Sequence, residues 1–120
     1  MIPVISESVY KIIYNLVAQK NVKEARHLGE ELSKAKVVKD DELGNKVVSL
    51  YSNVEFIDTS FNNPIRMQIV LPEEANLAKK KVSVFAPICV ALIGFKENDI
   101  FTWKMPSGEK TLQILKVMNT

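Results

Sequence analysis

The chain has 120 residues, of which 47% are hydrophobic and 25% are charged, and its formal net charge is +2. This length allows one domain, or one small domain with a helical appendage, and a core of modest size. Residues 1–46 and residues 47–120 each carry eight basic and seven acidic side chains. This even balance lacks the clustered basic excess that a phosphate backbone requires, so we expect no direct, specific nucleic-acid binding.

Residues 1–36 have the pattern of two short helices. Ser6 is a suitable N-cap, with Glu7 in the first turn. The first helix has an apolar face formed by Val9, Ile12, Ile13, Leu16 and Val17, and the second has one formed by Ala25, Leu28, Leu32 and Ala35. A turn of a few residues between them predicts an antiparallel helical hairpin with arms of about 20 Å. Its tip contains Lys20, Asn21, Lys23 and Glu24.

Residues 37–46 form a charged linker, and the pattern then changes to that of strands. The segments expected to be strands are Val47–Leu50, Asn53–Asp58, Ile65–Leu71, Val82–Phe85, Ile100–Lys104 and Thr111–Val117. The last two would form a hairpin about Pro106-Ser107-Gly108. We therefore expect an α+β chain, with a helical hairpin at 1–36, a linker at 37–46 and a mainly antiparallel sheet at 47–120.

One short helix interrupts the strands. Residues 88–93 are all apolar, and a helix that is apolar all round must be buried. Pro87 suits its first position and Gly94 suits its end, because glycine enters the left-handed region without steric cost. The chain thus enters this helix by a sharp turn at Phe85-Ala86-Pro87.

The sequence offers few groups for catalysis or metal binding. His27 and Cys89 are the only residues of their types and cannot supply the four ligands of a zinc site. Cys89 lies inside the apolar helix, where we expect it to be buried and unreactive. Asp40, Asp41 and Glu42 could share a divalent ion, but sequence neighbours rarely point at one centre, so an exposed linker is the better interpretation. We expect no catalytic residue, metal or cofactor.

The remaining composition bears on the compartment. A single cysteine excludes an internal disulfide and is typical of a reducing compartment. The apolar runs fall short of the roughly 20 residues that a membrane helix needs, and residues 1–5 lack the basic flank of a signal peptide. We expect a cytoplasmic protein that does not bind membranes.

Several of these segments together resemble a known family. Three segments are similar in order and spacing to the C-terminal signature of the Gre transcript-cleavage factors. They are Ser83 to Ile88, Ala91 to Gly94 with Asp99, and Pro106-Ser107-Gly108. Within that superfamily, the Ala86-Pro87 pair at the turn resembles the pair found at this turn in the regulators of nucleoside diphosphate kinase. Cys89 and Asn98 replace two glycines of the family pattern. The resemblance implies an FKBP-like fold for residues 47–120.

The resemblance also implies a partner. Gre factors bind bacterial RNA polymerase at its secondary channel and present acidic residues at the tip of a long coiled coil. The tip here carries two lysines and one acid, so we expect no stimulation of transcript cleavage. The positions that match the polymerase contact are Phe85, Ala86, Pro87 and the following Ile88. The resemblance thus predicts a non-enzymatic regulator that docks through this turn and competes with Gre factors.

A different class of function stays open. Peptidyl-prolyl isomerases share the FKBP-like fold, although fold does not determine function. Such an enzyme needs an aromatic pocket for proline, for which the sequence offers Tyr51, Phe56, Phe61, Phe101 and Trp103.

Overall fold

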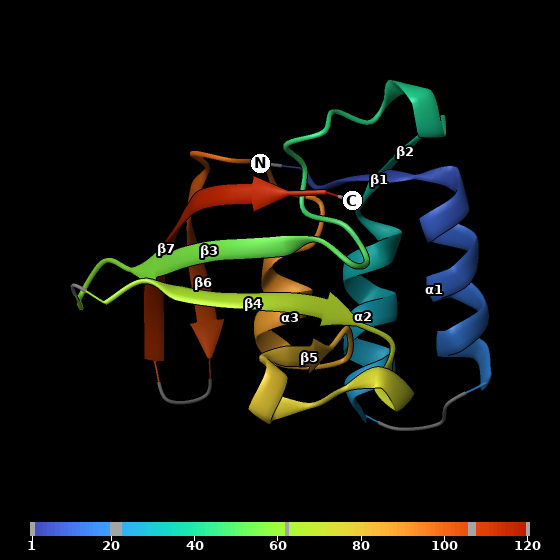
Figure 1. The fold of residues 1–120 in the computed structure, drawn as a ribbon. Helices are drawn as coiled ribbons and strands as arrows, with labels where there is room; N and C mark the ends of the chain where they lie inside the picture. Colours follow the sequence, from blue (N-terminus) through green and yellow to red (C-terminus); the bar gives the residue numbers. More distant parts are fainter. Residues whose placement is uncertain (1, 20–22, 62, 106–107, 120) are drawn as a thin grey trace.

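The computed structural model describes residues 2–19, 23–61, 63–105 and 108–119. Its regular elements are β1 (Val4–Ser6), α1 (Glu7–Gln19), α2 (Lys23–Ser33), β2 (Lys36–Val38), β3 (Asn53–Asp58), β4 (Ile65–Val70), β5 (Lys81–Ser83), α3 (Pro87–Leu92), β6 (Ile100–Met105) and β7 (Gly108–Met118). Short 3-10 turns occupy Asp40–Glu42, Pro72–Glu74 and Leu77–Lys79. The expected α+β class is confirmed (Figure 1).

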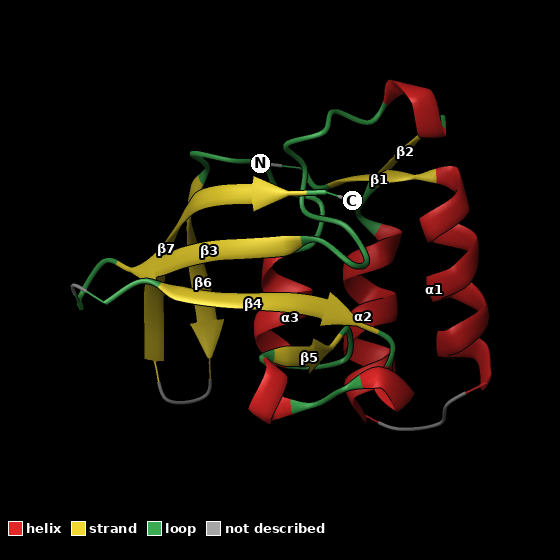
Figure 2. Ribbon diagram, in the orientation of Figure 1, coloured by secondary structure: helices red, strands yellow, loops and turns green. Residues whose placement is uncertain are grey.

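The strands form a mixed sheet of five with the order β5-β4-β3-β7-β6. β3 pairs antiparallel with β4 and β7, and β6 pairs antiparallel with β7. β5 instead lies parallel to β4. β1 and β2 make a separate parallel pair next to α1 and α2, which lie side by side (Figure 2).

One continuous core joins the sheet to α1, α2 and α3. Alternate residues of the central strands face α3, and the helices α1 and α2 contribute to the same cluster. Its largest fully buried members are Ile13, Leu28, Ile69, Leu92, Leu112 and Ile114. Because α3 covers this face, the intervening residues of β3, β4 and β7 point away from it on the outer face of the sheet.

The start of α1 is held by two side chains. Ser6 Oγ accepts a hydrogen bond of 3.4 Å from the Val9 N–H, as an N-cap should. Asp40, far along the chain, accepts a second bond of 3.0 Å from the Ser8 N–H. One detail of the expected apolar face is wrong: Ile13 is fully buried, but Ile12 is 44% exposed.

The strand expected at Val47–Leu50 is absent. Val47 makes an isolated bridge with Lys96, and the Val48 N–H donates a hydrogen bond of 2.7 Å to the Phe95 carbonyl. Val48 is buried, so the apolar pattern reflects burial against the end of α3 rather than strand pairing. Tyr51 then turns the chain into β3 with a φ of 69°.

Gly94 joins three distant segments just beyond α3. Its carbonyl accepts a hydrogen bond of 2.8 Å from the Val4 N–H, and its own N–H donates one of 2.9 Å to the Val48 carbonyl. Its φ is +89°, and a Cβ atom added here would lie 2.4 Å from the Pro3 Cβ. The predicted left-handed glycine is therefore confirmed, and its missing side chain is what lets β1 approach.

Replacing Gly94 by alanine should lower the free energy of unfolding by at least about 2 kcal/mol, because backbone strain and a clash with Pro3 add together. Urea denaturation measures this change. Gly44→Ala is the control, because its added Cβ would meet the Val47 Cγ2 at an ordinary 3.7 Å. Equal stabilities of the two variants would contradict the close approach described here.

Asp40 should make stability depend on pH. The hydrogen bonds from Ser8, with a smaller effect of Lys11, hold the pKa of this carboxyl below its ordinary value of 3.8. Because the folded pKa is the lower one, the stabilisation is present at neutral pH and is lost as the pH falls through about 4 and below. The melting temperature of Asp40→Asn should therefore be lower than wild type at about pH 7, and the gap should narrow towards about pH 3. Asp41→Asn is the matched control, and a gap that does not change with pH would refute the assignment.

Candidate functional site

The turn between β5 and α3 has a fixed backbone. The Phe85 N–H donates to Ser83 Oγ at 3.1 Å, and the Ala86 N–H donates to the Ser83 carbonyl at 2.9 Å. α3 begins at Pro87, as expected, and Ala86 precedes it without a side-chain cap. The turn therefore holds its side chains in place without the aid of a partner.

The four residues expected to bind a partner form one uncharged segment, Phe85 to Ile88. Pro87 is exposed, whereas Phe85, Ala86 and Ile88 are half-buried. All three half-buried side chains pack on the core. Phe85 is thus anchored on one side and accessible on the other, which suits a preorganised apolar contact.

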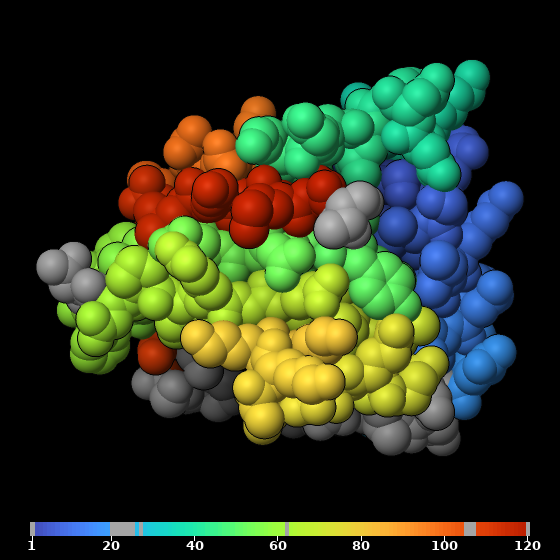
Figure 3. All heavy atoms as spheres, in the orientation of Figure 1, coloured from blue at the N-terminus to red at the C-terminus, as the bar shows by residue number. Residues whose placement is uncertain are grey.

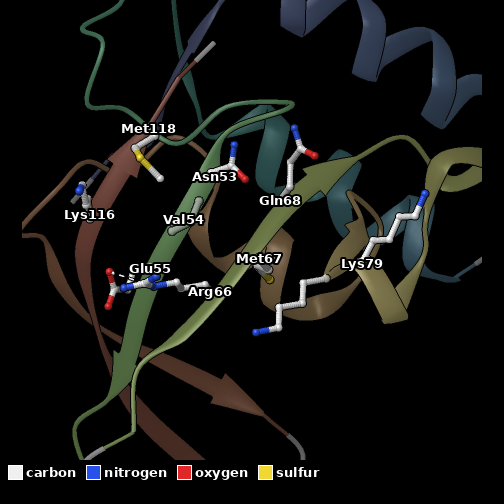
Figure 4. Close-up of a pocket in the computed structure, with 10 residues that line it drawn as sticks. Asn53, Val54, Glu55, Arg66, Met67, Gln68, Lys79, Lys116 and Met118 are labelled. Atoms are coloured by element: carbon white, nitrogen blue, oxygen red, sulfur yellow. Dashed lines mark ion pairs between the residues drawn. The ribbon is translucent and has the colours of Figure 1, made fainter.

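A second feature lies on the outer face of the sheet. A hollow of about 280 Å³ extends from β7 across β3 and β4 to the 3-10 turn before β5 (Figure 4). Its charged lining residues are Arg66, Lys79, Lys80, Lys116 and Glu55. Figure 3 looks onto this face, with β7 in red and β3 and β4 in green.

Three of these charges stand in one row across the sheet. Glu55 of β3 is in register with Arg66 of β4 on one side and with Lys116 of β7 on the other. The Arg66 Nε lies 3.5 Å from the Glu55 Oε2, and the Arg66 side chain is 75% exposed. The single carboxylate therefore stands between two cations.

The aromatic residues considered for an isomerase pocket do not line one hollow. Phe101 and Trp103 line a cavity of about 490 Å³ beside α3, together with Phe95, which stacks on Phe101 with ring centroids 4.6 Å apart. Phe56 is buried in the core, and Phe61 is 64% exposed. Tyr51 donates its hydroxyl hydrogen to Glu74 Oε1 at 2.5 Å.

Cys89 lies within α3 and is fully buried. Burial raises the pKa of its thiol to about 12, which leaves almost no thiolate at neutral pH. Its Sγ contacts the Val82 carbonyl oxygen at 3.9 Å. The expectation of a buried cysteine is confirmed.

The acidic run at Asp40–Glu42 forms a 3-10 turn, and Asp40 is used to cap α1. Across the described ranges, no three side chains of the His, Cys, Asp and Glu types gather as a metal site would require. Nor does any helix in those ranges have the length and apolar character needed to cross a membrane.

The expected hairpin tip falls largely outside the described residues. Lys20 and Asn21 lie in the segment 20–22, which the structure does not describe. Lys23 and Glu24 begin α2, but their side chains, like that of His27, are not described. The composition of the tip therefore rests on the sequence alone.

The basic hollow was not predicted from the sequence. Its four cations come from β4, from the turn before β5 and from β7, so a count along the chain shows only an even balance. In the sequence, Lys79 and Lys80 follow Glu73 and Glu74, whose charges balance theirs. The signal that was present is the alternation in β3, β4 and β7, which sets polar residues on the face opposite the core.

Comparison with known proteins gives agreement along the whole chain. A family model described as "Transcription elongation factor, GreA/GreB, C-term" matches residues 43–119. The GreA of Thioalkalivibrio sulfidiphilus is 35% identical over 94 residues, which cover 77% of this chain and 59% of that protein. The Escherichia coli regulator of nucleoside diphosphate kinase is 30% identical over 91 residues, which cover 75% of this chain and 67% of that protein.

Solved structures extend the agreement to the fold. A GreA/GreB structure from Nitrosomonas europaea superimposes with a TM-score of 0.78 at 26% identity and covers 99% of both chains. Gfh1 of Thermus thermophilus matches with a TM-score of 0.52 at 16% identity, which supports the fold alone. The match to the Thioalkalivibrio GreA spans only 59% of that protein's length.

The Cys89 thiol should resist labelling in the folded protein. Because the thiol is buried and its pKa is raised to about 12, a disulfide reagent at about pH 8 should react slowly until denaturant is added. The release of the coloured thiol product measures the rate. Lys96→Cys in a Cys89→Ala background is the exposed control and should react at once. Rapid, stoichiometric labelling of native wild type would contradict the burial of Cys89.

Proposed function

The chain belongs to the GreA/GreB transcription elongation factor family, and on this premise we propose that it is a non-enzymatic, cytoplasmic regulator that binds bacterial RNA polymerase near the secondary channel. The observation that carries the proposal is the agreement with the Nitrosomonas GreA/GreB structure over 99% of both chains. That agreement includes the helical pair as well as the sheet. The match to a regulator of nucleoside diphosphate kinase supports a regulatory branch of the family.

We propose three functional parts within this chain. Residues 1–36 form a short antiparallel hairpin, residues 37–46 link it, and residues 47–120 form an FKBP-like domain that docks on the polymerase. The site of docking is the turn Phe85 to Ile88, because its backbone is fixed and its apolar residues are partly accessible. A preorganised turn loses little conformational entropy on binding.

We further propose that this protein does not stimulate transcript cleavage and competes with Gre factors that do. α1 has 13 residues and α2 has 11, so the arms are only about 20 Å and 17 Å long. Ile13 of α1 and Leu28 of α2 are buried in the common core, so the helices pack on the rest of the molecule rather than project from it. Gre factors hold magnesium at the polymerase active site with acidic residues at the tip of a long coiled coil. The helices here are short, and their tip carries two lysines and one acid.

A second candidate is a peptidyl-prolyl isomerase or another interaction module of FKBP-like fold. The observation that favours it is the hollow beside α3 that Phe95, Phe101 and Trp103 line. A chymotrypsin-coupled tetrapeptide assay distinguishes the two candidates. Measurable isomerisation that Trp103→Ala abolishes would replace the polymerase proposal with this one.

Binding to purified bacterial core RNA polymerase tests the docking proposal. Phe85→Ala and Pro87→Ala should each weaken binding about tenfold, which corresponds to about 1.4 kcal/mol, because each removes apolar contact area from a small interface. Fluorescence anisotropy of the labelled protein gives the affinity. Phe61→Ala is the matched control, because Phe61 is an exposed phenylalanine away from the turn.

A Gre factor added as competitor should displace the bound protein, and cleavage of a backtracked transcript should be inhibited rather than stimulated. No binding at tens of micromolar would refute docking. Stimulated cleavage would refute the proposed role while leaving docking intact.

A further inference from the structure

We propose that the outer face of the sheet binds an acidic, extended polypeptide segment at the hollow lined by Arg66, Lys79, Lys80 and Lys116. This site is separate from the proposed polymerase contact. α3 covers one face of the sheet and follows the turn Phe85 to Ile88, whereas the hollow lies on the opposite face (Figure 4). The two proposals therefore succeed or fail independently.

The charge of the molecule is concentrated at this hollow. Four basic side chains and one carboxylate line it, a balance of +3, whereas the whole chain carries +2. All other side chains together therefore carry one net negative charge. Such segregation on a protein with a low net charge attracts an acidic partner to one face in particular.

The row across β7, β3 and β4 already shows how a carboxylate is held. Glu55 lies in register between Lys116 and Arg66, and its Oε2 is 3.5 Å from the Arg66 Nε. Among the described lining residues Glu55 is the only carboxylate, and its ion pair is with Arg66, so Lys79 and Lys80 have no ion-pair partner in the described lining. An incoming Asp or Glu side chain supplies the negative charge that this side of the hollow lacks.

The lining favours a polypeptide over a nucleic acid. Single-stranded nucleic acids bind through basic grooves that also present aromatic rings for base stacking. None of the described residues that line the hollow is aromatic; beside the charged groups they are Asn53, Val54, Met67, Gln68 and Met118. Amide and thioether groups among cations suit the backbone and side chains of an acidic peptide.

A labelled peptide of six glutamates is the probe. Fluorescence anisotropy in about 50 mM salt should show saturable binding that weakens as salt is added, because exposed ion pairs are screened. The triple variant Lys79→Gln, Lys80→Asn, Lys116→Gln should bind about tenfold more weakly, since three exposed ion pairs are lost. Asparagine is chosen at position 80 because Lys80 has a φ of 58°, which asparagine tolerates.

The control has the same net charge. It is the triple variant Lys36→Gln, Lys96→Gln, Lys104→Gln. This variant also lacks three exposed lysines, but none of them lines the hollow. This control should keep the wild-type affinity within about twofold, because screening limits the effect of distant charges. An equal loss in the two triple variants would show attraction by overall charge and would overturn the proposal.

A gain of binding gives the sharpest test. Glu55→Gln removes the one carboxylate among the described lining residues and frees Arg66, so the hexaglutamate peptide should bind about threefold to tenfold more tightly. Unchanged or weaker binding by a Glu55→Gln protein with a wild-type melting curve would count against the site. Absence of binding by wild type at low salt, or tighter binding of a ten-residue oligouridine than of the peptide, would overturn the proposal.

Discussion

The approach of the N-terminal strand to Gly94 is the contact on which the arrangement of this molecule depends. At that point β1, the end of α3 and the segment that enters β3 are connected through one residue's backbone groups. A side chain at position 94 would occupy the space of Pro3. The helical pair is thus joined to the sheet by backbone hydrogen bonds as well as by apolar packing, and Ile13 and Leu28 share one core with Ile69 and Leu112.

This joint sets the positions of both proposed binding surfaces. With α3 held against one face of the sheet, the apolar turn that precedes it is displayed at the edge of that face. The other face is left to the polar residues of β3, β4 and β7, which meet in register as a basic row. An uncharged contact and a charged one therefore lie on different sides of a small protein, where one partner does not exclude the other.

Much of the fold was predictable because local signals and burial agree. Ser6, Pro87 and Gly94 have conformational preferences that fix where helices begin and end, and they do so here. The alternating segments from Asn53 onward became strands. The error at Val47–Leu50 has a physical cause: alternating burial also arises where an extended chain packs on a helix end, without a strand partner.

The sites were harder to predict than the fold. The turn Phe85 to Ile88 is contiguous, so the sequence displays it directly, but only the structure shows that Phe85 is half-buried. The basic face combines Arg66, two lysines of one turn and Lys116, which only strand register brings together. A charge count along the chain averages over the two faces of a strand and cannot detect such a site.

The joint at Gly94 also has a consequence for synthesis on the ribosome. Val4 is synthesised long before Gly94, to whose carbonyl its N–H donates a hydrogen bond, and β3 is synthesised long before its partner β7. At about 5–20 residues per second, the helical pair exists for several seconds without the core that buries Ile13 and Leu28. The nascent chain therefore carries an uncovered apolar helix face until β7 has been synthesised, and chaperone protection during that interval is of most value to the helical pair.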